Sequence, residues 1–168
     1  DLRVLQCILR KKEDLISSVD SEGKTLAHVA IISDDHNILE WLLKEEPSLV
    51  HSVDCKGRTL AHMAAKMEES LDWLLSEKPS LIHSVDCKGR TLAHAALEKQ
   101  EYLYRSLDFR ERLDILKLLF AKEPSLISSV DNRGRTLAHM AVGIDCKEGY
   151  GAGCESLAFI LKKEPGLV

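Results

Sequence analysis

The 168-residue sequence is poor in aromatic residues, with two tryptophans, three tyrosines and three phenylalanines. It also has no excess of basic charge, because 23 lysines and arginines stand against 27 aspartates and glutamates, for a net charge of −4. A surface that binds nucleic acid needs basic side chains to neutralise phosphates and aromatic rings to stack on bases. The composition therefore argues against a nucleic-acid-binding protein.

Other absences narrow the class of protein further. No apolar run approaches the roughly 20 residues that a membrane span requires, and no stretch of the sequence has the form of a signal peptide. The five cysteines include no C-x-x-C pair, which is typical of a reducing compartment rather than of a disulfide-rich secreted protein. We therefore expect a cytoplasmic protein with no membrane partner, in which Cys55 and Cys87 remain thiols.

One phrase, by contrast, is present four times. The copies begin 34, 32 and then 45 residues apart. Recurrence at such a period is typical of stacked-repeat proteins, which offer long, shallow surfaces rather than deep pockets. The copies are SVDSEGKTLAH at 18–28, SVDCKGRTLAH at 52–62, SVDCKGRTLAH at 84–94 and SVDNRGRTLAH at 129–139.

Each copy predicts a tight turn that leads into a helix. In the second copy, Asp54 can hydrogen-bond to the backbone two residues on, and Gly57 can adopt a positive φ without strain. Thr59 is a good N-cap for the helix, and His62, three residues later, can reach back to it as in a capping box. This pattern assigns a structural role to the four repeated histidines, which are His28, His62, His94 and His139.

A second helix with bulky apolar residues follows each phrase. Leu39, Trp41, Leu42 and Leu43 recur at helical spacing, and similar sets recur at 71–75, 116–120 and 157–161. All four prolines of the chain lie just after this helix and end it, since proline cannot continue a helix. An extended segment is then expected to lead back to the next turn. One such unit cannot bury its own apolar face, so neighbouring units must stack.

The unit resembles the ankyrin repeat: it has the pattern D-x-x-G-x-T-x-x-H-x-A, a helix pair and a period near 33 residues. It differs in reading T-L-A-H where the family commonly has T-P-L-H. The resemblance implies an all-α fold, a solenoid of stacked helix-turn-helix units joined by hairpin-like turns. It covers a single domain over 1–168, with a leading partial repeat at 1–19 and repeats at 20–53, 54–85, 86–130 and 131–168. The third of the full repeats carries an insertion.

The turns predict a first candidate binding surface. Their basic residues outnumber their acidic ones, although the chain as a whole is acidic. We expect these residues to form a basic edge that meets an acidic patch on a protein partner; a solvated surface copied by duplication is the alternative. The residues of this basic edge are Lys24, Lys56, Arg58, Lys88, Arg90, Arg133 and Arg135.

The insertion, around 97–112, predicts a second candidate surface. It contains three of the eight aromatic residues of the chain, Tyr102, Tyr104 and Phe109. Exposed Tyr and Phe side chains commonly anchor interfaces, but these rings could equally pack the insertion onto the body of the array. Its composition favours helix. The longer linker of the last repeat, 143–154, is expected to be a flexible connector.

The first helices differ between copies at the residue after the histidine. Met63 and Met140 occupy this place in two repeats, and methionine is an adaptable contact residue. The resemblance implies that turns and first helices line the concave face of the array, so we include both methionines among the candidate partner-binding residues. Burial in the core is the alternative.

Catalytic and metal sites are not predicted. The glycine-rich segment at 149–153 follows no strand and lacks Gly-Lys-Ser/Thr, so it does not indicate a nucleotide site. The pairs His51/Cys55 and His83/Cys87 belong to different repeats, too far apart for the zinc–ligand distances of about 2.0–2.3 Å. We expect no metal, no cofactor, no catalytic residues and no enzymatic activity.

These observations favour a monomeric, non-catalytic adaptor or scaffold that binds a protein partner through its concave face and basic turns. Two alternatives remain open. The array could be the targeting segment of a larger enzyme, or of a bacterial effector delivered into the host cytosol, as the resemblance allows. It could also associate with itself through the repeat faces at its ends.

Overall fold

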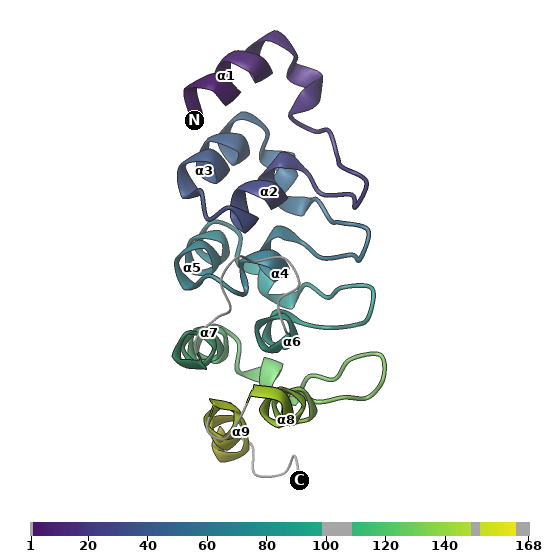
Figure 1. The fold of residues 1–168 in the computed structure, drawn as a ribbon, viewed down its shortest axis with the longest axis vertical. Helices are drawn as coiled ribbons and strands as arrows, with labels where there is room; N and C mark the ends of the chain where they lie inside the picture. Colours follow the sequence, from purple (N-terminus) through teal and green to yellow (C-terminus); the bar gives the residue numbers. More distant parts are fainter. Residues whose placement is uncertain (1, 99–108, 149–151, 164–168) are drawn as a thin grey trace.

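The computed structural model describes residues 2–98, 109–148 and 152–163, and the array has the all-α repeat architecture that the sequence predicts. The helices stand in two columns, and the turns between repeats project from one side (Figure 1). A leading helix, α1 (Leu2–Lys11), precedes a short 3-10 turn, η1 (Glu13–Leu15). The first helices are α2 (Leu26–Ile32), α4 (Leu60–Ala64), α6 (Leu92–Leu97) and α8 (Leu137–Glu148). The second helices are α3 (His36–Glu45), α5 (Glu68–Glu77), α7 (Phe109–Lys122) and α9 (Ala152–Lys163).

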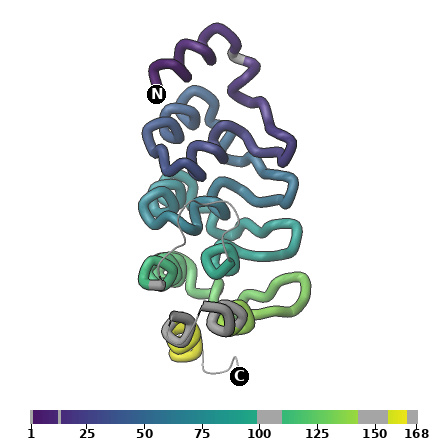
Figure 2. The backbone as a smooth tube through the Cα atoms, viewed as in Figure 1, coloured from purple at the N-terminus to yellow at the C-terminus, as the bar shows by residue number. Residues whose placement is uncertain are grey.

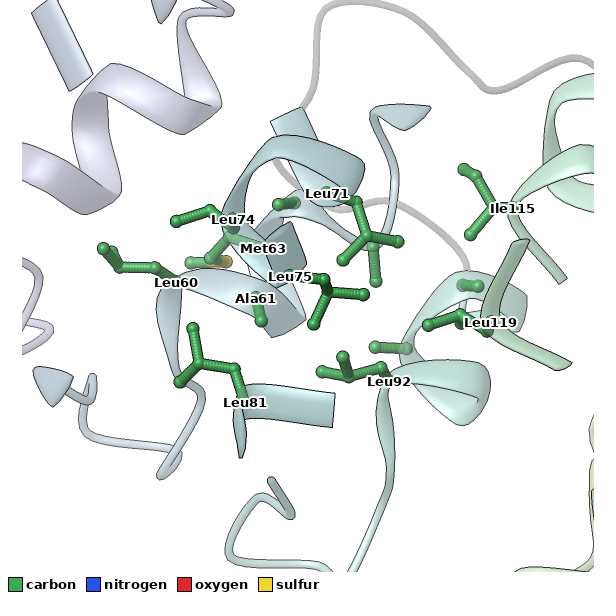
Figure 3. Close-up of a cluster of buried hydrophobic side chains, with 14 of the residues drawn as sticks. Leu60, Ala61, Met63, Leu71, Leu74, Leu75, Leu81, Leu92, Ile115 and Leu119 are labelled. Atoms are coloured by element: carbon green, nitrogen blue, oxygen red, sulfur yellow. The ribbon is translucent and has the colours of Figure 1, made fainter. Parts of the chain in front are cut away.

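Packing within and between repeats makes one continuous core. Each first helix contacts the second helix of its own repeat. The first helices also contact one another in order along the array, α2 with α4, α4 with α6 and α6 with α8. Small residues permit this approach, since Ala61 and Ala64 of α4 have no exposed surface. Leucines fill the space between the columns, and Leu60, Leu74 and Leu92 are also fully buried (Figure 3).

The segment that follows α3, α5 and α7 differs from the extended return that the sequence predicts. It begins with a 3-10 turn: η2 (Pro47–His51), η3 (Pro79–His83) and η4 (Pro124–Ser128). Proline opens each one because its fixed φ suits a first helical position and its missing N–H is not needed there. In η2 the turn buries two apolar residues that an extended chain would point to opposite sides, since Leu49 and Val50 are each only 3% exposed.

Helices extend into both of the longer connections. α7 has 14 residues against 10 in α3 and α5, so the insertion lengthens this helix, as its composition favours. The expected flexible connector at 143–154 is wrong for most of its length, because α8 continues to Glu148 and α9 begins at Ala152. Gly143 lies inside α8, where a glycine costs about 1 kcal/mol relative to alanine. α8 also packs against α9.

The turns are joined to one another by backbone hydrogen bonds. The N–H of Cys55 donates to the carbonyl of Glu22 at 2.8 Å, and the N–H of Cys87 donates to that of Lys56 at 3.0 Å. Asn132 N–H donates to the Lys88 carbonyl at 2.8 Å, so the insertion does not change the register of the turns. The turns consequently lie one above another along one edge of the array (Figure 2).

Glycine is required in these turns for two separable reasons. Gly57 and Gly134 both have a φ of +71°, where an alanine costs about 1–2 kcal/mol. A Cβ on Gly57 would also lie 2.9 Å from the backbone nitrogen of Cys87, whereas a Cβ on Gly134 meets no described atom within 4 Å.

We therefore expect Gly57→Ala to destabilise the array by about 1 kcal/mol more than Gly134→Ala, because it also disturbs the hydrogen bond from Cys87. Urea unfolding followed by circular dichroism measures both variants under the same conditions. Equal losses would show that positive φ alone selects glycine and that contact between neighbouring turns contributes nothing.

Candidate interaction surface

The aspartate of each phrase organises its turn. Oδ1 of Asp54 accepts hydrogen bonds from the N–H groups of Lys56 and Arg58, each at 2.9 Å, and the N–H of Asp54 donates to the Arg58 carbonyl at 3.0 Å. Asp86 and Asp131 repeat this arrangement. The predicted tight turn is therefore confirmed, and its aspartate is buried in the second to fourth phrases: Asp54 is 5% exposed and Asp86 is 6% exposed, whereas Asp20 of the first phrase is exposed.

Three arginines close these turns from inside. Nε of Arg58 lies 2.8 Å from Oδ2 of Asp54 and Nη2 lies 2.6 Å from the same oxygen. The corresponding distances are 2.7 and 2.5 Å for Arg90 with Asp86, and 2.8 and 2.6 Å for Arg135 with Asp131. Burial acts to raise the pKa of Asp131, but the hydrogen bonds from the Arg135 side chain and backbone outweigh it and lower that pKa to about 2.

The basic edge is consequently smaller than the sequence indicates. Arg58 is 7% exposed and Arg90 is 4% exposed, so the expectation that both lie on the surface is wrong. It is also wrong for Lys24, which is 8% exposed and forms an ion pair with Glu22. Arg135 is half-buried. Lys56 is partly exposed, and Lys88 and Arg133 are fully on the surface. We call Lys56, Lys88 and Arg133 the turn cations.

A row of exposed valines accompanies these cations. The residue before each turn aspartate is Val19, Val53, Val85 or Val130, with exposed fractions of 61%, 51%, 55% and 53%. Side chains alternate between two sides of an extended chain, so Val53 and Cys55 are exposed while Asp54 between them is buried. Sequence reasoning missed this valine row, although the repeated letters S-V-D carried the signal.

The repeated histidines connect neighbouring repeats. Nδ1 of His62 accepts a hydrogen bond from the N–H of Thr59 at 3.3 Å, which completes the predicted capping box. Nε2 of the same ring lies 3.0 Å from the carbonyl oxygen of Arg90 in the next repeat. The neutral tautomer with a proton on Nε2 satisfies both contacts. His28 and His94 make the equivalent pairs of contacts. Burial lowers the pKa of all three rings, which keeps them neutral.

Three charged side chains, Lys66 of the second repeat and Arg90 and Glu98 of the third, lie close together at the boundary between these repeats. Nη1 of Arg90 donates to Glu98, the last described residue before 99–108. Burial lowers the pKa of the Lys66 ammonium; the Glu98 carboxylate opposes this effect and nearby arginines, Arg58 first among them, add to it. Glu98 therefore fixes the start of the insertion to the turn of its own repeat.

The other candidate partner-binding residues lie either in or against the core or outside the residues that the structure describes. Met63 is 9% exposed and belongs to the core, while Met140 is half-buried against it. Tyr102 and Tyr104 lie outside the described residues, as does the side chain of Phe109. Cys7, Cys55 and Cys87 are exposed free thiols.

The described residues contain neither a metal-ligand cluster nor a membrane-spanning helix. Within residues 2–98, 109–148 and 152–163, histidine, cysteine, aspartate and glutamate form no group of three or more that could hold a metal ion. None of the helices in these ranges is both long enough and apolar enough to cross a membrane.

Comparison with known proteins agrees with the repeat geometry. Residues 1–82 match a family model described as ankyrin repeats, in three copies. A search of curated proteins finds no match to the chain. Ankyrin repeats are generally protein–protein interaction modules and are typically non-catalytic. The same turn, capping box and helix pair recur after residue 82, in α6 with α7 and, around the exposed His139, in α8 with α9. Residues 1–82 therefore belong to the ankyrin-repeat family, and the later units repeat the same architecture.

Proposed function

We propose that this chain is a non-catalytic adaptor that binds an acidic protein partner along the edge formed by its turns. The observation that carries this proposal is the repetition, in three consecutive turns, of an exposed valine and a cation three residues later. These pairs are Val53 with Lys56, Val85 with Lys88, and Val130 with Arg133.

Rigidity supports the proposal. The backbone hydrogen bonds between turns and the buried Asp–Arg pairs hold the edge in one conformation, so binding does not have to order it first. The cations lie on an array with a net charge of −4. An acidic partner would therefore be steered to the turns and repelled from the acidic remainder of the surface. Exposed free thiols are compatible with the cytoplasm as the proposed location, because reducing conditions preserve them.

The test reverses the charge of the turn cations, with Lys56→Glu, Lys88→Glu and Arg133→Glu combined in one variant. Arg58 and Arg90 are left intact, since glutamate there would face the buried Asp54 and Asp86 and unfold the turn. The matched control is Lys44→Glu, Lys78→Glu and Lys162→Glu, three exposed lysines away from the turns.

We expect partners that the native chain captures from cell extract to be lost by the turn variant and retained by the control variant. The loss should exceed about tenfold in capture, since each reversed charge turns an attraction into a repulsion. Retention of every partner by the turn variant, with unchanged circular dichroism, would refute the proposed surface.

A further inference from the structure

The arrangement of the valine row beside the turn cations defines the partner more closely. This step rests on the proposed function and specifies the partner's secondary structure. We propose that the turns of the second to fourth repeats bind an acidic amphipathic α-helix that lies along the array and has a seven-residue period.

The first argument is the chemistry of the edge. Each of the three turns exposes a valine to more than half of its full area, and Cys55 and Cys87 extend the apolar surface in two of them. Exposed apolar surface gathered beside charged groups is typical of a binding site. A complementary partner therefore needs an apolar stripe and a parallel stripe of carboxylates.

The second argument is spacing. Helices packed side by side lie about 8–10 Å apart, so equivalent side chains of stacked repeats recur at about that distance. The hydrogen bonds from Cys87 to Lys56 and from Asn132 to Lys88, at 3.0 and 2.8 Å, keep this register across all three turns. The partner should present equivalent side chains at nearly the same interval.

The third argument is the match to an α-helix. Seven residues of helix rise about 10.5 Å and return a side chain to nearly the same face. A β-strand repeats a face about every 6.7 Å, and neither this interval nor twice it agrees with the turns. A helix about 10–12 Å wide can also cover the valines and the cations together.

The backbone of the turns favours the same answer. Their inward N–H and carbonyl groups already bond to the neighbouring turns, so an extended peptide could not join the edge as an added strand. A helix satisfies its own backbone groups and brings only side chains to the edge. A polyproline II segment, with a turn of about 9.3 Å, has a similar interval and is the competitor that the experiment must distinguish.

The experiment compares three synthetic 28-residue peptides of nearly equal composition. The first has leucine every seven residues with glutamates on the adjacent helical face; the second has the same residues in an order that destroys the period; the third keeps the order but has prolines that prevent a helix. Binding is measured by fluorescence anisotropy at low salt, and helix formation by circular dichroism. We expect the periodic peptide to bind at least about tenfold more tightly than either control and to gain helix on binding.

A variant of the array makes the test specific. Val53→Thr, Val85→Thr and Val130→Thr keep the β-branched shape that suits the extended chain but remove apolar surface, and they should weaken binding of the periodic peptide about tenfold. The control carries Val4→Thr, Val29→Thr and Val142→Thr, three exposed valines outside the row, and should bind normally.

Two results would overturn the inference: equal binding of the periodic and reordered peptides, or equally tight binding of the proline peptide. Neither result would contradict the proposed function, which is tested separately by the loss of captured partners when the charges of the turn cations are reversed. If the turn variant still captures every partner and the three peptides bind equally, the edge is not a binding surface. If the turn variant loses its partners but the three peptides bind equally, the partner is acidic but is not a periodic helix.

Discussion

Replacement of Arg90 by methionine is expected to lower the free energy of unfolding by about 3 kcal/mol, because it leaves a buried carboxylate without its cation. Arg90 donates to Oδ2 of Asp86 from Nε at 2.7 Å and from Nη2 at 2.5 Å, and its side chain is 5% exposed. Methionine retains much of the apolar stem, so the loss reports mainly on the charge and its hydrogen bonds.

The environment of Asp86 explains why the loss should be large. Burial acts to raise the pKa of this carboxyl group, but hydrogen bonds from Arg90 and from the Lys88 N–H lower it below its usual value. Without Arg90, the effect of burial is opposed only by backbone N–H groups. The folded variant must then either hold a poorly compensated charge or take up a proton, and each alternative destabilises the turn.

Two control substitutions separate this explanation from a general sensitivity of the turn. Lys88→Met changes an exposed lysine in the same turn and should alter stability by less than about 0.5 kcal/mol. Arg135→Met removes the same kind of ion pair and also leaves a buried carboxylate, since the Asp131 side chain is 1% exposed, but the arginine side chain is 38% exposed, so water can partly replace it and the loss should be smaller, about 2 kcal/mol. Urea unfolding gives all three values. A loss for Arg90→Met no larger than for Arg135→Met would show that this ion pair is dispensable.

This ion pair also shows what the sequence could predict and what it could not. Asp, Gly, Thr and His recur at fixed places, and their individual backbone preferences led correctly to the turn, the capping box and the helix pair. The side chain of the arginine at the fifth position has no such local preference. Charge counting placed it on the surface, whereas the turn folds it back onto an aspartate four residues earlier. The recurrence of Asp54/Arg58, Asp86/Arg90 and Asp131/Arg135 at one spacing was the signal for this pairing.

The candidate surface was harder to derive than the fold for a related reason. Val53 reads as an ordinary residue of an extended segment, since β-branched residues favour that conformation. Its exposure became evident only once Asp54 was seen to point inward, because alternation then places both neighbours outward. Likewise, the register of the turns across the 45-residue interval depends on contacts between repeats. No pattern within one repeat contains that information.

The second large loss of stability is expected at a capping histidine. His62→Ala is expected to destabilise the array by about 3 kcal/mol, since it leaves the Thr59 N–H and the Arg90 carbonyl without their partner and opens a cavity. His62 is 2% exposed, and its contacts measure 3.3 and 3.0 Å. His139→Ala is the matched control, because His139 is exposed and caps Thr136 in the last turn. Its loss should be about 1 kcal/mol, the usual value of a cap.

The pH dependence of this difference distinguishes a hydrogen-bonded ring from one that merely fills space. Burial lowers the pKa of His62 below its usual value of 6.5, with the hydrogen bond to the Arg90 carbonyl opposing this effect, so folding favours the neutral ring. The contribution of His62 is therefore complete above pH 6.5 and decreases as the pH falls from 6.5 through the folded-state pKa. In the folded protein Nδ1 accepts a hydrogen bond from the Thr59 N–H, so a proton on Nδ1 would face that N–H and break the hydrogen bond. The stability difference between native chain and His62→Ala, measured by urea unfolding from pH 8 to pH 5, should be greatest at pH 8. A difference independent of pH would mean that His62 contributes volume alone.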